Sequence, residues 1–140
     1  MGLANFNRTA AEIAHQRQQA KFYFKALAYC KAIQVLGAAP LKGDRAVYPF
    51  ISILIAKNRD CLFPNLALQS LGVSLLFAKF LPEYPYLRQY LTDESSENYP
   101  NAVRLCKTLV TLSTTAFIKP REIYEIVQLI QAMVEGKDVE

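Results

Sequence analysis

The sequence predicts an all-α protein: a compact bundle of five to six helices with a long first helix, in one helical domain over residues 1–140. Three observations favour this fold class. Hydrophobic residues make up 52% of the chain and charged residues 20%, which excludes a disordered tail and predicts an ordinary core. The 5 glycines and 7 prolines are few and separate longer apolar segments. Within those segments, apolar residues recur at the steps of a helix face.

The first predicted helix runs from Thr9 to Leu36. Thr9 and Glu12 have the spacing of a capping box, in which a hydroxyl and a carboxylate satisfy backbone N–H groups at a helix start. Gly37, followed by Pro40, supplies the left-handed residue that often ends a helix. Because the first half of this segment is polar and the second half apolar, we expect the helix to begin in solvent or at a partner and to end in the core.

A second helix is predicted over residues 47–57, with Pro49 in its first turn. The alternating Ile51, Ile53 and Ile55 would also suit a buried strand. We favour a helix because the sequence shows no second clear strand that would pair with this one.

Two longer helices and one short helix are predicted next. Leucines and phenylalanines over residues 66–80 indicate a third helix, and a short helix follows that ends near Leu91. An acidic loop over residues 92–98 then precedes a helix over residues 102–117, with Pro100 where a first-turn proline belongs.

The closing helix has the clearest amphipathic pattern in the chain. It is predicted to begin at Pro120 and to end at Gly136. One of its faces carries Ile123, Ile126, Val127, Ile130 and Val134.

The net charge of +4 is distributed unevenly. Residues 1–59 carry nine basic and two acidic side chains, a balance of +7, whereas residues 60–140 carry seven basic and ten acidic ones, a balance of −3. On the first predicted helix, Arg17, Lys21 and Lys25 follow one another at four-residue steps with no neutralising acid, so they share one face. Such a stripe is typical of a surface that binds a polyanion, although a solvated helix face is the simpler alternative.

Loops on either side of the second predicted helix extend this basic surface if they fold alongside it. The predicted nucleic-acid-binding residues are Arg17, Lys21, Lys25, Lys42, Arg45, Lys57 and Arg59.

Motifs for catalysis are missing from the sequence. It contains no glycine-rich phosphate loop, no serine elbow and no paired metal-ligand spacing, and its one histidine, His15, offers few options for a general base. Cys30, Cys61 and Cys106 are scattered, so we expect small buried thiols in a reducing cytoplasm. The sequence therefore predicts no enzyme, no catalytic residues, no metal and no cofactor. Its apolar stretches are shorter than the roughly 18 residues of a membrane span, so no membrane partner is expected.

A basic, helical chain with Arg17, Lys21 and Lys25 on a long first helix, and with the closing segment PREIYEIVQLIQAMVEG, resembles the small subunit of CRISPR effector complexes, most of all the type I-D version. The resemblance implies a non-catalytic, cytoplasmic subunit of a ribonucleoprotein. Such a subunit would contact guide RNA and target DNA through its basic face and would lie beside other effector subunits and neighbouring copies of itself. The alternative hypothesis is a helical protein–protein adaptor or regulatory bundle that does not bind nucleic acid.

Overall fold

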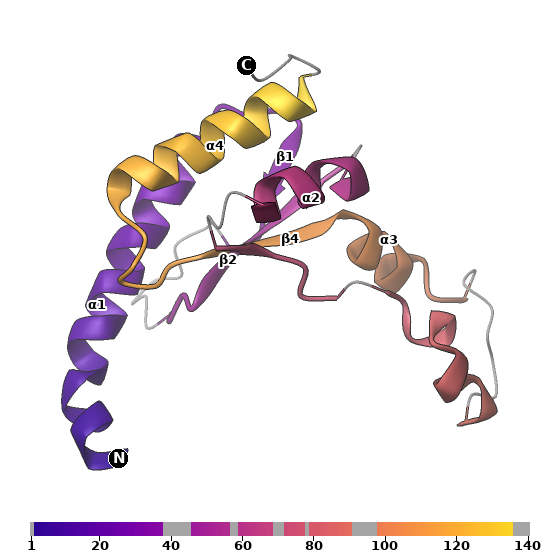
Figure 1. Cartoon of the computed structure of the whole chain (residues 1–140), viewed down its shortest axis with the longest axis horizontal. Helices are drawn as coiled ribbons and strands as arrows, with labels where there is room; N and C mark the ends of the chain where they lie inside the picture. The colour runs from indigo at the N-terminus through magenta and orange to yellow at the C-terminus, as the bar shows by residue number, and fades with distance from the viewer. Residues whose placement is uncertain are drawn as a thin grey trace.

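The computed structural model describes residues 2–37, 46–56, 59–68, 72–77, 79–90 and 98–135. This part of the chain contains both strands and helices (Figure 1). The elements are α1 (Gly2–Leu27), β1 (Ile33–Val35), β2 (Phe50–Ile55), α2 (Arg59–Leu68), β3 (Val73–Ser74), the 3-10 helices η1 (Leu81–Glu83) and η2 (Pro85–Tyr90), α3 (Pro100–Thr108), β4 (Leu109–Ser113) and α4 (Pro120–Val134). The prediction of an all-α bundle is therefore wrong, because the protein is built on an antiparallel sheet.

The sheet has four strands in the order β1-β2-β4-β3, and each neighbouring pair is antiparallel. Ile33 lies opposite Ile55 in the first pair, and Ile53 lies opposite Val110 in the second. Side chains from one face of these strands meet α1 and α4, which lie against each other along the sheet (Figure 1). The core between these layers consists mainly of Ala20, Tyr23, Leu27, Ile51, Ile53, Ile55, Val110, Leu112, Ile123, Ile126, Val127 and Ile130.

The predicted first helix is too long at its C-terminal end and too short at its N-terminal end. α1 begins at Gly2, so Thr9 and Glu12 lie inside the helix and do not cap its start. It ends at Leu27, because the following apolar residues pair with β2 as strand β1 instead of continuing the helix. Gly37 does have the predicted positive φ, 70°, but the turn that it forms follows a strand.

The second predicted helix is a strand, the alternative that the isoleucine pattern left open. Ile51, Ile53 and Ile55 are all buried on β2, at the centre of the sheet. The partner strands over residues 33–35 and 109–113 are too short to show alternation in the sequence, and each lies within a segment that was predicted to be helical.

The two predicted helices over residues 66–80 and 102–117 are also incorrect in extent. α2 ends at Leu68, and the sheet strand β3 and an extended segment follow in the described residues up to Phe80. Residues 102–117 change from helix α3 to strand β4 between Thr108 and Leu109. Each prediction failed because local apolar spacing was continued across a point where the chain enters the sheet.

Predictions near the C-terminal end are confirmed. Pro100 lies in the first turn of α3, and α4 begins at Pro120 with the predicted face turned to the core. The Lys119 backbone N–H donates to the Glu122 carboxylate at 2.7 Å, which closes the first turn of α4. The short helix before Leu91 is present as η2, whereas Leu91, residues 92–97 and Gly136 lie outside the described residues.

Among the helices of the described residues, none has both the length and the apolar character that a bilayer crossing requires.

Candidate functional site

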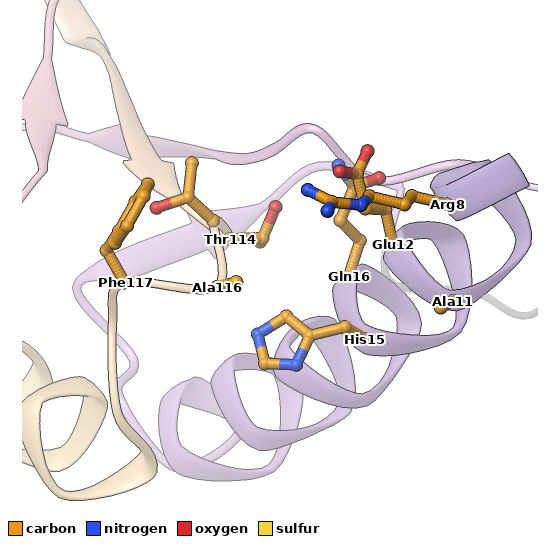
Figure 2. Close-up of a pocket in the computed structure, with 9 residues that line it drawn as sticks. Arg8, Ala11, Glu12, His15, Gln16, Thr114, Ala116 and Phe117 are labelled. Atoms are coloured by element: carbon orange, nitrogen blue, oxygen red, sulfur yellow. The ribbon is translucent and has the colours of Figure 1, made fainter. Parts of the chain in front are cut away.

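A pocket of about 510 Å³ lies between α1 and the segment that joins β4 to α4 (Figure 2). Its α1 wall is formed by side chains spaced three or four residues apart, which places them on one helix face. Its opposite wall is formed by residues 114–117. The lining residues are Arg8, Ala11, Glu12, His15, Gln16, Thr114, Thr115, Ala116 and Phe117.

Both walls of the pocket are fixed by hydrogen bonds from buried side chains. The Tyr23 hydroxyl donates to the Ser113 carbonyl at 3.2 Å, and Gln19 Nε2 donates to the Ile118 carbonyl at 2.7 Å. These bonds attach α1 to both ends of the 114–117 segment. The Thr114 hydroxyl also donates to the Tyr48 carbonyl, so the segment is held from the sheet side as well.

His15 projects from α1 toward the 114–117 segment (Figure 2). The Gln19 atom that faces Ile118 must be the amide nitrogen, because a carbonyl oxygen only accepts hydrogen bonds. That same nitrogen lies 3.1 Å from His15 Nε2. His15 Nε2 therefore accepts, and the proton of the neutral imidazole is assigned to Nδ1.

Two buried acceptors near His15 have no partner among the described residues. They are the side-chain carbonyl oxygens of Gln16 and Gln19. An unpaired buried polar group costs about 1–3 kcal/mol, so this polar stretch of α1 has hydrogen-bonding capacity that the described protein atoms do not use.

Most of the accessible surface that lines the pocket is apolar, its charged side chains balance each other, and one exposed ring stands at its edge. The formal charges of Arg8 and Glu12 cancel. The Thr115 hydroxyl accepts from the Ser113 hydroxyl at 3.3 Å and so keeps its own proton for another acceptor. Phe117 is 91% exposed.

The cysteines do not add a reactive group to this site. Only Cys30 is buried as predicted, whereas Cys61 is exposed and Cys106 half-buried. Burial and then the charge of Glu83 raise the pKa of the Cys106 thiol, and the charge of Arg59 opposes them without reversing the shift. A raised pKa disfavours the thiolate. No group of three or more potential metal ligands occurs among the described residues.

The residues predicted to bind nucleic acid do not form one free basic surface in the described part of the chain. Lys21 and Lys25 are exposed on α1. The half-buried Arg17 donates through Nε to the Ala46 carbonyl at 2.9 Å. Arg59 is only 6% exposed. The remaining predicted residues, Lys42, Arg45 and Lys57, lie outside the described residues.

Arg59 has protein partners for its guanidinium. Its Nε donates to the Asp60 carboxylate at 2.8 Å, and a terminal nitrogen donates to the Cys106 carbonyl on α3. Sequence reasoning treated this residue as a surface cation, whereas it joins α2 to α3.

His15, Gln16 and Phe117 were not predicted as a site. The only signal in the sequence was the four-residue step from His15 to Gln19.

Comparison with known proteins identifies the architecture. The model of the DegT/DnrJ/EryC1/StrS aminotransferase family matches residues 1–131. The structure of DesI in the presence of its TDP-sugar product superposes with a TM-score of 0.81 at 17% identity, over 98% of this chain and 35% of that one. DesV from S. venezuelae gives 0.76 at 15% identity, over 96% and 34%. The PLP-form of Spr1654 from Streptococcus pneumoniae, described as a sugar aminotransferase, gives 0.79 at 17%, over 96% and 34%.

This chain therefore spans about a third of the length of these solved structures. No curated protein matches its sequence.

The family match overturns the resemblance to a CRISPR small subunit, together with the predicted nucleic-acid-binding function and the predicted effector-complex and nucleic-acid partners. The prediction of no enzyme is wrong as well, because the family and its structural neighbours are aminotransferases. The incorrect functional prediction rested on the uneven charge distribution, which is a weak indicator of function.

The described residues do not fit the cofactor that the family implies. PLP is held by a lysine that forms an imine with it and by a charged partner for its ring nitrogen. The six described lysines are all exposed, and none lines the pocket of Figure 2. Lys31 lines another pocket, of about 340 Å³, together with Arg104, but this lysine is exposed like the other five. The six are Lys21, Lys25, Lys31, Lys79, Lys107 and Lys119.

Proposed function

Because the chain belongs to the DegT/DnrJ/EryC1/StrS aminotransferase family, we propose that it forms one part of a PLP-dependent sugar aminotransferase and supplies a wall of the substrate site. The observation that carries the proposal is the match in fold, which takes in nearly the whole of this chain and about a third of DesI, DesV and Spr1654. The DesI structure was obtained with a TDP-sugar product, which supports a nucleotide-linked sugar as the class of substrate.

The cofactor lysine comes from the remaining part of the assembly in this proposal. The bound PLP would supply the carbonyl that accepts and returns an amino group. The present chain contributes groups that bind and orient the substrate beside it. Since the described lysines are exposed, no step of the reaction is assigned to them.

Exposed apolar side chains support association with a larger body. The first half of α1 projects beyond the sheet (Figure 1), and residues 6–12 are all exposed. Phe6 in this half is 75% exposed. An unpacked helical segment of this length is marginal in water, because most helical stability comes from packing of an apolar face. Leu81, Tyr86 and Tyr90, on η1 and η2, are also exposed.

Cofactor trapping on the isolated chain tests the proposal. We expect that incubation with PLP, reduction with borohydride and peptide mapping will label no single lysine in stoichiometric amount. When the tagged protein is purified from its native host, PLP should be found on chain outside residues 1–140 or on a co-purifying polypeptide. That preparation should then transfer an amino group between a TDP-linked keto sugar and an amino acid. Stoichiometric labelling of one lysine in the isolated chain would contradict the proposed division of labour, and so would a PLP-free preparation.

Substitutions on α1 provide the matched control. Phe6→Asp should abolish association with the PLP-carrying polypeptide, because it places a charge in the proposed apolar contact. Tyr29→Asp alters an aromatic residue that is 88% exposed beyond the other end of α1, and it should leave association unchanged.

A further inference from the structure

We propose that the pocket between α1 and residues 114–117 binds the sugar ring of the substrate, with His15 and Gln16 as hydrogen-bonding groups and Phe117 as a stacking platform. This inference rests on the proposed function for the class of molecule. The choice of pocket, and of ring over phosphate, rests on the chemistry of the lining.

His15 offers a donor of fixed identity. Gln19 Nε2 donates a hydrogen bond to His15 Nε2, so the imidazole proton lies on Nδ1. No hydrogen bond from Nδ1 is found among the described residues. Gln19 is itself buried and anchored to the Ile118 carbonyl, so the ring is oriented by a group that belongs to the core. A neutral imidazole with a fixed tautomer can donate to a hydroxyl oxygen without carrying charge.

Gln16 offers an adaptable amide. Its side chain makes no hydrogen bond within the described residues, and its carbonyl oxygen is buried without a partner. Rotation about the last side-chain torsion exchanges the amide oxygen and nitrogen, so either atom can face the pocket. An amide left unpaired in this way gains hydrogen bonds when a ligand arrives, whereas a paired one would have to give them up.

The electrostatic balance of the pocket favours a neutral hydroxylated ring over a phosphate. A phosphate needs donors and positive charge, and the Glu12 carboxylate would repel it while Arg8 attracts it. Sugar hydroxyls both donate and accept, so they match a lining that contains Arg8, His15 and Thr115 as donors and Glu12 and Gln16 as acceptors.

Phe117 supplies the apolar part of the recognition. Phe117 is 91% exposed at the rim of a pocket whose accessible lining is mainly apolar, so its phenyl ring is free to extend that apolar surface toward a ligand. The C–H face of a sugar ring is apolar, and stacking on Phe117 would remove both surfaces from water. The volume of about 510 Å³ lies within the range of roughly 300–1,000 Å³ that is typical of small-molecule sites.

Saturation-transfer NMR on the full isolated chain tests this site. The probes are TDP-glucose, TDP and inorganic phosphate, each measured separately and in competition. We expect saturation of the sugar-ring protons of TDP-glucose, weaker saturation of the thymidine protons, and no displacement by phosphate. Saturation of the thymidine protons alone, displacement by phosphate, or no binding of TDP-glucose would each overturn the inference.

Single substitutions then locate the binding. Phe117→Ala and His15→Ala should each weaken TDP-glucose binding about two- to twelvefold, since each removes one contact worth about 0.5–1.5 kcal/mol. Tyr29→Ala removes an equally exposed ring outside the pocket and should change nothing. In the assembled enzyme, the two pocket variants should raise KM for the TDP-sugar and leave KM for the amino donor unchanged.

The two proposals fail separately. If the isolated chain binds the sugar ring but the preparation from the native host carries no PLP, the proposed function fails and the pocket assignment stands. If the assembly is active and its KM for the TDP-sugar is unaffected by Phe117→Ala and His15→Ala, the proposed function stands and the pocket assignment fails.

Discussion

Replacing Arg59 by alanine tests whether this side chain stabilises the fold or is a free surface charge. The side chain is 6% exposed at the start of α2, and its guanidinium donates to the Cys106 carbonyl on α3 and to Asp60. A hydrogen bond from a charged donor contributes about 1.5–3 kcal/mol. Asp60 is 76% exposed, so that ion pair adds at most about 1 kcal/mol. We therefore expect Arg59→Ala to lower the free energy of unfolding by about 2–4 kcal/mol.

Urea unfolding followed by circular dichroism measures this loss. With a slope of about 2 kcal/mol per molar urea, the midpoint should fall by about 1–2 M. Lys21→Ala removes the same charge from an exposed position on α1 and should change stability by less than about 0.5 kcal/mol. Arg59→Lys keeps the charge but loses the forked geometry, so its stability should lie between those of the wild type and the alanine variant. Equal midpoints for Arg59→Ala and Lys21→Ala would refute the reasoning.

Two further predictions concern backbone strain and pH. A Cβ added at Gly72, where φ is 67°, would lie 2.8 Å from both Ile118 Cδ1 and Ser113 Cβ, so Gly72→Ala should cost about 2–4 kcal/mol in urea unfolding. Gly37→Ala, at a φ of 70° but in open space, should cost only about 1–2 kcal/mol, and equal losses would contradict the packing argument. Burial raises the pKa of Tyr23 above its ordinary value, so above about pH 10 the unfolded chain releases a proton that the folded chain keeps, and stability falls as pH rises. Tyr23→Phe should cost about 0.5–1.5 kcal/mol at neutral pH and show a shallower alkaline decline; identical slopes would show that this tyrosine does not control it.

Elements whose evidence is local could be predicted from the sequence, and α4 is the clearest case. Its apolar face repeats with the helical period, and a first-turn proline marks its start, so no information from elsewhere in the chain is needed. The strands are different because a strand is stable only beside its partner. β2 pairs with β4, which lies far along the chain and directly after a helix, so the isoleucine pattern of β2 was ambiguous when read alone.

The site was missed for a related reason. His15 and Gln19 are one helical turn apart, and their contact is implied by the sequence once the helix is accepted. The opposite wall is formed by residues 114–117, whose approach to α1 depends on the sheet and on the bond from Gln19 to Ile118. The predicted basic stripe shows the limit of helical spacing as evidence. The spacing places Arg17 in line with Lys21, but the Arg17 side chain donates a hydrogen bond to the Ala46 carbonyl.

α1 changes along its length from an exposed first part to a second part that carries buried residues, and this change organises the whole proposal. Near its C-terminal end, Tyr23 and Leu27 belong to the core, so this end is held rigidly against the sheet. In the middle, His15 lines the pocket where the helix leaves the core. Toward the N-terminus, Phe6 is exposed on a part of the helix that the sheet does not support. Because one rigid helix of 26 residues links these regions, a partner that contacts Phe6 also determines how the pocket wall is placed relative to the cofactor that the partner carries.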